Sequence, residues 1–255
     1  MSDRNPIEIG VEIESTIRRY LQAALPISHR YPHLEKEIES KLNSHELLLK
    51  GPYVEALSDF EKGASLQNLC ESNGGILSNE FSALDDNLLR RPLHRHQEQA
   101  IRAMVQEEKN VIVATGTGSG KTECFLYPVL DTLLRDGNLH RPGIRALLIY
   151  PLNALANDQL YRRLVPLFIK QFEESGITVG RYTGLTKNGM KRSNIEAELL
   201  QGESFFRNEM GWTTSIPQQW LLTRDEMRAT PPHVLVTNYA MLEHMLLFPQ
   251  NEGLF

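Results

Sequence analysis

The chain has 255 residues and a formal net charge of −5 at pH 7, with 41% hydrophobic and 23% charged residues. These values are ordinary for a soluble globular protein, and the mild acidity does not favour nucleic-acid binding through overall positive charge. No apolar segment approaches the roughly 18 residues that span a bilayer, and the N-terminus has no apolar core of signal-peptide length. The two cysteines, Cys70 and Cys124, form no zinc or disulfide pattern. We therefore expect a reducing, cytoplasmic location and no membrane partner.

The first 85 residues are predicted to form a helical accessory segment. Apolar residues at helical spacing predict helices over residues 6–25 and 31–49, and a short third helix over residues 54–60. Residues 72–75, Ser-Asn-Gly-Gly, indicate a turn or linker. The segment contains no recognisable catalytic cluster. It either packs on the domain that follows or docks a partner or DNA.

A glycine-rich loop between a predicted strand and a predicted helix organises the rest of the chain. Asn110–Ala114 is a short apolar, β-branched run typical of a buried strand, and a helix is predicted from Lys121 to about Leu134. Three glycines between them let the backbone fold tightly. This order is that of a phosphate-binding loop, whose amides form an anion-binding nest at a helix N-terminus. Lys121 would reach the β- and γ-phosphates, and the Thr122 hydroxyl would ligate Mg²⁺.

The loop departs from the strict pattern at its first position, where Thr115 replaces glycine. The string from Thr115 to Thr122 resembles motif I of superfamily 2 helicases, in which that glycine is usually replaced. The resemblance implies ATP and Mg²⁺ as cofactors and Lys121 and Thr122 as catalytic residues. The residues of this stretch expected to bind ATP are Thr115, Gly116, Thr117, Gly118, Ser119, Gly120, Lys121, Thr122 and Glu123.

Gln97 lies some two dozen residues before Lys121. In superfamily 2 helicases a glutamine at this distance reads the adenine edge. A glutamine amide suits that role because it donates and accepts at once, which matches adenine N6 and N7. We therefore predict that Gln97 recognises the adenine of ATP. The neighbouring His94 and His96 are expected to be structural rather than metal ligands.

A second strand is predicted over residues 144–150, followed by Pro151 and Asn153. This junction is similar to helicase motif Ia, in which the helix N-terminus presents amides to a nucleic-acid phosphate. Asn153 stands where the family usually has a basic residue. Phosphate contact would then depend on hydrogen bonds and the helix dipole rather than on a full charge. An ordinary strand-to-helix junction has the same pattern.

Two further strands are predicted over residues 177–181 and 234–236. The first precedes a Thr-Gly pair that matches a glycine-containing loop of the family. The second precedes a Thr-Asn pair that resembles motif Ic and is also a plain helix N-cap. The residues that the resemblance assigns to nucleic-acid contact at these two strand ends are Thr183, Gly184, Thr237 and Asn238.

The polar stretch 187–210 is predicted to be a solvated helix and loop inserted between strands. Trp212 and Trp220 are expected to anchor this insertion to the core more often than to stack on bases. Asp225-Glu226 is the only Asp-Glu pair, and it follows no predicted strand. It is therefore misplaced for the acidic motif II that holds Mg²⁺ in helicases.

The ordered series of motifs resembles the N-terminal part of a bacterial DEAD/DEAH-box superfamily 2 helicase, close in wording to MrfA-type and defence-associated helicases. The resemblance covers about residues 91–250. It implies an α/β fold in which a P-loop NTPase, RecA-like parallel sheet is flanked by helices and preceded by a helical N-terminal segment. Residues 86–255 would form the first ATP-binding helicase domain, incomplete because the chain ends before the acidic motif.

The family reaction is ATP hydrolysis that drives translocation on nucleic acid, or its unwinding. DNA is expected rather than RNA, and the partner would be the missing C-terminal helicase domain. Because motif II is absent, hydrolysis by this chain itself is left open. Two alternatives stand beside this interpretation. One is a truncated, non-catalytic nucleotide-binding or regulatory module, and the other is a P-loop ATPase unrelated to helicases.

Overall fold

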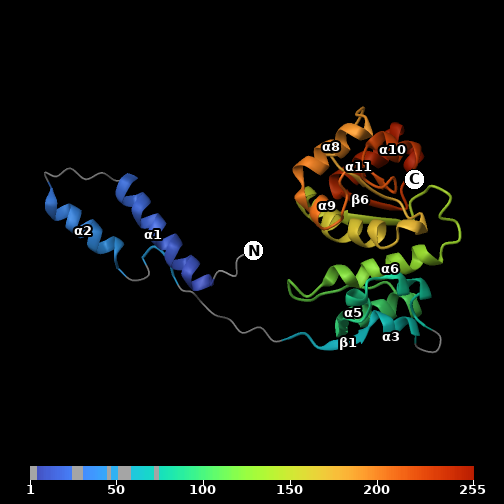
Figure 1. The fold of residues 1–255 in the computed structure, drawn as a ribbon, viewed down its shortest axis with the longest axis horizontal. Coiled ribbons are helices and arrows are strands. Elements are labelled where there is room, and N and C mark those ends of the chain that lie inside the picture. The colour runs from blue at the N-terminus through green and yellow to red at the C-terminus, as the bar shows by residue number, and fades with distance from the viewer. Residues whose placement is uncertain (1–4, 25–30, 45–46, 51–58, 72–74) are drawn as a thin grey trace. The chain divides into compact units, whose positions relative to one another are not determined.

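The computed structural model describes residues 5–24, 31–44, 47–50, 59–71 and 75–255, in two units, Met1–Asp59 and Phe60–Phe255 (Figure 1). The described part of the first unit contains helices α1 (Pro6–Ala24) and α2 (Pro32–Leu42). The predicted helices over residues 6–25 and 31–49 are therefore confirmed, although the second ends earlier than predicted. The predictions for residues 54–60 and 72–75 lie almost entirely outside the described residues.

The second unit begins with a small subdomain of short helices and a two-stranded antiparallel sheet, β1–β2. Its buried side chains, Leu66 and Phe81 among them, join the main hydrophobic core. Residues 60–71 and 75–85 thus belong to the second unit, and the predicted domain boundary at residue 86 stays a prediction. The elements are β1 (Lys62–Ser65), α3 (Leu66–Glu71), η1 (Asn79–Ala83), α4 (Asp86–Leu89), β2 (Pro92–His94), α5 (Arg95–Ile101) and η2 (Arg102–Gln106).

The core of the second unit is a four-stranded parallel sheet in the order β3–β6–β4–β5. The predicted α/β fold with a parallel sheet flanked by helices is confirmed, and so are the strands expected near residues 144–150, 177–181 and 234–236. Strand β5 has only two residues and was not predicted. The strand bounds are β3 (Ala146–Tyr150), β4 (Val179–Tyr182), β5 (Trp220–Leu221) and β6 (Val234–Asn238).

Helices cover both faces of this sheet, and the central strand β6 is buried on both of them. Val234 and Val236 face one hydrophobic cluster, whereas Leu235 faces the other. This alternation follows from the two-residue period of a strand. The helical elements of this part are α6 (Lys121–Arg135), α7 (Asn153–Gln159), η3 (Leu160–Lys170), η4 (Glu173–Ser175), α8 (Arg192–Gly202), α9 (Ser204–Asn208), α10 (Arg224–Ala229), α11 (Tyr239–Leu247) and η5 (Pro249–Leu254).

The insertion between β4 and β5 folds onto the core through its aromatic side chains. Phe206 stacks with Trp212 at a centroid distance of 6.1 Å and lies 5.3 Å from Trp220. Trp220 is buried, and Trp212 packs against the same cluster. Both tryptophans anchor the insertion in this way. None of the helices in the described part of the chain is both long and apolar enough to cross a membrane.

The strand predicted over Asn110–Ala114 does not form. Helix η2 ends at Gln106, Glu108 has a φ of +52°, and the Lys109 amide donates to the Ala103 carbonyl at 2.8 Å. Residues 110–114 then form neither helix nor strand, and Ile112 is 96% exposed. The prediction was wrong because a β-branched run suits a strand only where a neighbouring strand supplies hydrogen bonds and cover.

Candidate nucleotide-binding site

The glycine-rich loop lies at the N-terminus of the 15-residue helix α6. Gly118 and Gly120 have φ values of +78° and +74°, a left-handed conformation that side chains with a Cβ rarely adopt. Gly120 is the N-cap of α6, so the first free amides of this helix face the loop. Inside the loop, the Thr115 and Ser119 hydroxyls lie 2.6 Å apart. The loop is thus a small, closed turn over a helix N-terminus.

The ammonium group of Lys121 lies inside this turn. Its Nζ donates to the Thr115 carbonyl at 2.8 Å and to the Gly116 carbonyl at 2.7 Å. A Cβ built on Gly116 or Gly118 would meet no other atom within 4 Å, so this side of the loop has open space beside it. A positive charge, helix amides and free space are what a phosphate group requires. Thr122 follows in the first turn of α6, half-buried, with a hydroxyl suited to Mg²⁺.

Helix α5 holds the loop from the opposite side. The Gln97 amide nitrogen donates to the Gly120 carbonyl at 2.9 Å, and its oxygen accepts from the His94 amide at 2.8 Å. His96 Nε2 lies 2.9 Å from the Ser119 carbonyl. Gln97 is only 3% exposed. In this structure its amide fixes the loop, and adenine recognition by Gln97 stays a prediction. The contact of His96 with the loop was not predicted.

A cleft of about 1270 Å³ opens in front of the loop. Thr117–Glu123 form one wall, one turn of η3 forms another, and α9 with its flanking residues forms a third. Across the cleft, Arg163 of η3 lies 3.2 Å from the Glu123 carboxylate. The sequence gives no signal for this pair, because its members lie 40 positions apart and meet only through helix packing. The other side chains from η3 and α7 that line the cleft are Leu155, Asp158, Gln159, Tyr161 and Arg162.

The residues predicted to contact nucleic acid lie at the carboxyl ends of neighbouring parallel strands. Asn153 lies after β3, and Asn238 is the last residue of β6. The side-chain Nδ2 of Asn238 donates to the side-chain oxygen of Asn153 at 2.5 Å. Asn238 also caps α11 by accepting from the Met241 amide at 2.7 Å. The structure therefore brings the two asparagines together. Pro151 and Gly184 are exposed and lie just after β3 and β4.

Two of these predicted residues are buried instead. Thr237 donates to the Tyr182 carbonyl at 2.7 Å, which ties β6 to β4. The Thr183 amide donates to the Thr186 hydroxyl at 3.0 Å inside the turn after β4. Both threonines have no exposed surface. Their observed role is to shape the strand ends that present Gly184 and Asn238.

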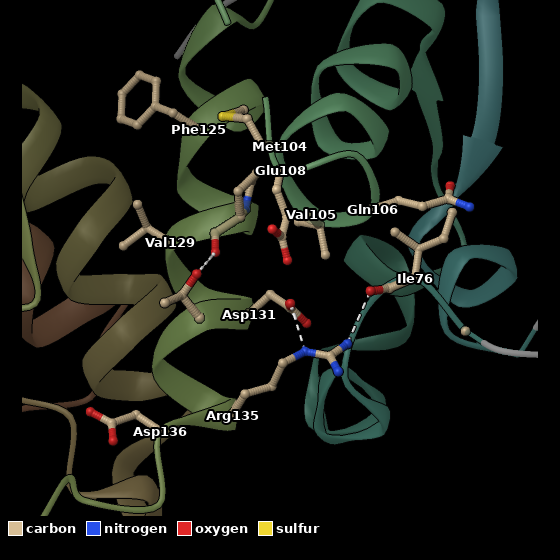
Figure 2. Close-up of a pocket in the computed structure, with 13 residues that line it drawn as sticks. Ile76, Met104, Val105, Gln106, Glu108, Phe125, Val129, Asp131, Arg135 and Asp136 are labelled. Atoms are coloured by element: carbon tan, nitrogen blue, oxygen red, sulfur yellow. Dashed lines mark hydrogen bonds and ion pairs between the residues drawn. The ribbon is translucent and has the colours of Figure 1, made fainter. Parts of the chain in front are cut away.

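Figure 2 shows a second cavity, of about 710 Å³, against another face of α6. Arg135 reaches between the Asp131 carboxylate at 2.8 Å and the Ile76 carbonyl at 3.0 Å. Asp131 also accepts from the Ser78 amide at 2.6 Å. These charges join α6 to the subdomain of residues 60–106. None of the predicted site residues lines this cavity.

The Asp225-Glu226 pair is engaged in local structure. Glu226 accepts from the Leu222 and Thr223 amides at 2.7 and 3.0 Å, while its own amide donates to the Thr223 hydroxyl. Asp225 accepts from the Gly189 amide at 2.6 Å. The pair therefore caps α10 and fixes a turn. Neither residue lines the cleft in front of the loop.

Fold and loop together define an α/β protein with a glycine-rich loop at the N-terminus of a helix, the arrangement expected of a phosphate-binding loop. Residues 94–203 match the DEAD/DEAH box helicase family, and the predicted resemblance to these helicases is confirmed. The matched segment begins at His94, three residues before Gln97, and runs through the glycine-rich loop and β4 into the insertion.

Individual relatives are similar to the chain over differing lengths. It is 30% identical over 325 aligned positions to the Druantia protein DruE of Escherichia coli, covering all of this chain and 18% of DruE. It is 29% identical over 163 positions to an uncharacterised ATP-dependent helicase, MJ1574, of Methanocaldococcus jannaschii, covering 64% of this chain and 18% of that protein. The chain thus spans less than a fifth of the length of these relatives.

A solved structure is similar as well. The DUF1998 helicase MrfA, bound to DNA and AMPPNP, matches 76% of this chain and 21% of its own length, with 22% identity and a TM-score of 0.44. Because this similarity is low, the fold is described from the sheet of this chain alone.

Proposed function

We propose that this chain is the ATP-binding part of a nucleic-acid-dependent ATPase or helicase, in which ATP hydrolysis drives translocation or unwinding by the longer protein. The observation that carries the proposal is the loop at the N-terminus of α6, with Lys121 inside it. A triphosphate would displace the two carbonyl groups that Lys121 now contacts. Thr122 would then ligate the Mg²⁺ that accompanies ATP. The DEAD/DEAH box match supports ATP as the nucleotide.

Nucleic acid is proposed to bind at the carboxyl ends of β3, β4 and β6. The hydrogen-bonded pair Asn153 and Asn238 supports this proposal, because it joins two strand ends where helices α7 and α11 begin. Amide groups at helix N-termini contact phosphate without reading bases. We propose DNA rather than RNA, and a cytoplasmic location. Binding should be weak and salt-sensitive, because the chain is acidic overall.

The test is a calorimetric titration of the chain with ATP and Mg²⁺, beside the variant Lys121→Ala. We expect measurable binding by the unaltered chain and none by the variant, with matching circular dichroism spectra. The variant Lys109→Ala is a suitable control, because Lys109 pairs with Glu107 before the loop begins. Equal ATP affinity in the unaltered chain and in Lys121→Ala would refute the phosphate-binding assignment.

A non-catalytic nucleotide-binding module is the second candidate, and one observation favours it for this chain by itself. Glu226 caps α10 and Asp225 accepts from the Gly189 amide, and neither lines the cleft beside Thr122. Phosphoryl transfer needs electrostatic stabilisation of the attacking and leaving oxygens. In helicases part of it comes from an acidic pair and an arginine finger, and the finger alone contributes about 10³–10⁵ in rate. Neither is identified beside Thr122 among the described residues. We therefore expect ATP binding with almost no turnover. Robust ATPase activity stimulated by DNA or RNA and lost in Lys121→Ala would favour a complete catalytic site.

A further inference from the structure

The wall of the cleft that faces the loop carries two consecutive arginines of η3. Arg162 pairs with Asp158 at 3.0 Å, and Arg163 pairs with Glu123 at 3.2 Å. The first pair lies within one helical turn, and both its side chains are largely exposed. The second pair crosses from η3 to the first turn of α6, directly after Thr122. The two neighbouring arginines therefore pair with different carboxylates, one on the preceding turn and one on α6.

Glu123 is a buried carboxylate, 8% exposed, with one oxygen in an ion pair and the other, Oε2, without a hydrogen-bond partner among the described residues. A Cβ built on Gly120 would lie 3.1 Å from this oxygen, which places it beside the loop backbone. A buried carboxylate needs a compensating charge. The salt bridge recorded for Glu123 is the one to Arg163.

Arg163 is far more exposed to solvent than its partner. Its side chain is 51% exposed, whereas that of Glu123 is 10% exposed. A guanidinium group carries five donors in a planar fork, which fits phosphate oxygens as well as it fits a carboxylate. A triphosphate on the loop would offer several negative oxygens in the same cleft. The exposed end of Arg163 then has a second anionic partner within its reach.

We propose that Arg163 is a phosphate-contacting residue for the nucleotide on the loop, and that Glu123 holds it at the cleft while the site is free of nucleotide. This inference rests on the proposed function, since it requires a nucleotide at residues 115–122. Arg163 would add a positive charge to the phosphate site from η3, a helix outside the glycine-rich loop. Arg162 serves as the matched control, since it lines the same cleft but is attached to Asp158.

The test compares the affinities of the full chain for ATP, ADP and AMP, with Mg²⁺ present. We expect Arg163→Ala to weaken ATP about tenfold or more and AMP by less than about twofold, because charge-assisted hydrogen bonds to phosphate are lost. Arg162→Ala should change neither affinity by more than about twofold. Equal losses in the two variants, or no loss in Arg163→Ala, would overturn the proposal.

A double variant separates direct contact from simple neutralisation of Glu123. If Arg163 only offsets the Glu123 charge, Glu123→Gln combined with Arg163→Ala restores the ATP affinity of the unaltered chain, and the proposal fails. If Arg163 contacts phosphate, the double variant stays several-fold weaker. The proposed function has its own outcome: without ATP binding by the unaltered chain, both fail. Binding that needs Lys121 but not Arg163 removes the Arg163 assignment alone.

Discussion

The parallel sheet and the segment that leads into the glycine-rich loop are both β-branched and apolar, yet only the sheet is ordered by its neighbours. Val234–Val236 of β6 have no exposed surface, since β3 and β4 pair with β6 on either side and helices cover both faces. Residues 111–113, Val-Ile-Val, are as apolar as the Val-Leu-Val of β6, but Ile112 is 96% exposed. Burial and pairing, rather than residue type, make the difference.

The outer edge of β3 shows the other side of this comparison. Among the described residues, β3 pairs only with β6. Leu147 and Ile149, which alternate with the buried Leu148, are 36% and 48% exposed. An edge strand with exposed apolar side chains and unpaired backbone groups can accept a further strand. The segment 110–114 does not occupy that edge in this structure.

The largest expected effect contrasts a core residue with the exposed segment. Phe168 of η3 is fully buried in the main cluster. Phe168→Ala should lower the free energy of unfolding by about 3–5 kcal/mol, because it leaves a cavity. Ile112→Ala should change that free energy by less than about 0.5 kcal/mol, as for other exposed positions. Chemical denaturation of both variants measures the contrast. A comparable loss at Ile112 would show that residues 110–114 are packed after all.

The second effect tests whether the loop, unlike the segment before it, has a fixed conformation. Gly120→Ala places a Cβ 2.4 Å from Gln97 Nε2 at a φ of +74°. We expect a loss of about 2–3 kcal/mol, from left-handed strain of about 1–2 kcal/mol and one displaced hydrogen bond of about 1 kcal/mol. Gly116→Ala meets nothing within 4 Å and should be neutral for stability. Thermal unfolding decides, and equal stabilities of the two variants would contradict a fixed loop.

These cases show which features the sequence could predict. The helix at residues 121–135 and the strands β3, β4 and β6 follow from local periodicity and punctuation, and they were predicted near their observed positions. Residues 110–114 were predicted wrongly, because a strand also needs a partner that local pattern cannot supply. The two-residue strand β5 is too short for any periodicity.

The candidate site divides in the same way. Lys121 and Thr122 were selected because loop and helix are contiguous in sequence. Arg163 was not, because its approach to Glu123 depends on how η3 packs against α6. Gln97 was selected from its distance before Lys121 in the sequence, but its hydrogen bond to the Gly120 carbonyl was not predicted. Contacts between elements are tertiary information, and a single sequence carries little of it.

The third effect concerns the contact between β1 and α5, the helix that in turn holds the loop. Glu98 accepts from the Ala64 amide and from Arg102 Nε, both at 2.8 Å. Burial raises the pKa of Glu98, but these hydrogen bonds and the charge of Arg102 outweigh it, and the pKa lies below the ordinary 4.5. Glu98→Gln should cost about 1–2 kcal/mol, the margin of a charge-assisted over a neutral hydrogen bond.

The sign of the pH dependence follows from the lowered pKa of Glu98. Its contribution is complete above pH 4.5 and is lost as the pH falls through the folded-state pKa. Urea denaturation of the parent and Glu98→Gln at pH 7 and pH 4 measures it. The difference between the two proteins should shrink at the lower pH. A difference that grows on acidification would contradict a carboxylate held in its charged form.

The smallest expected effect lies at the opposite end of the sheet, where His233 precedes β6. Its Nδ1 accepts from the Thr178 amide at 3.0 Å, and Nε2 lies 3.2 Å from the Arg141 carbonyl, which assigns the proton of the neutral ring to Nε2. Burial is the main cause that lowers the pKa of His233 below 6.5, and the charge of Arg145 adds to it, against opposing contributions from the Arg141 carbonyl and Asp136. Protonation would remove the acceptor that Thr178 uses. The sheet should therefore lose stability on mild acidification.

Because the folded-state pKa of His233 is lowered, its contribution is complete above pH 6.5 and declines as the pH falls towards the folded-state value. The linkage relation limits the loss at pH 6 to less than about 1 kcal/mol. His233→Gln offers an acceptor and a donor but cannot titrate, so the loss between pH 7 and pH 6 should be smaller in this variant than in the parent. Denaturation curves at the two pH values, with His140→Gln as an exposed control, measure the slope. An unchanged slope in His233→Gln would assign the pH dependence to another group and leave His233 as a purely steric contact between β6 and the residue 141 turn.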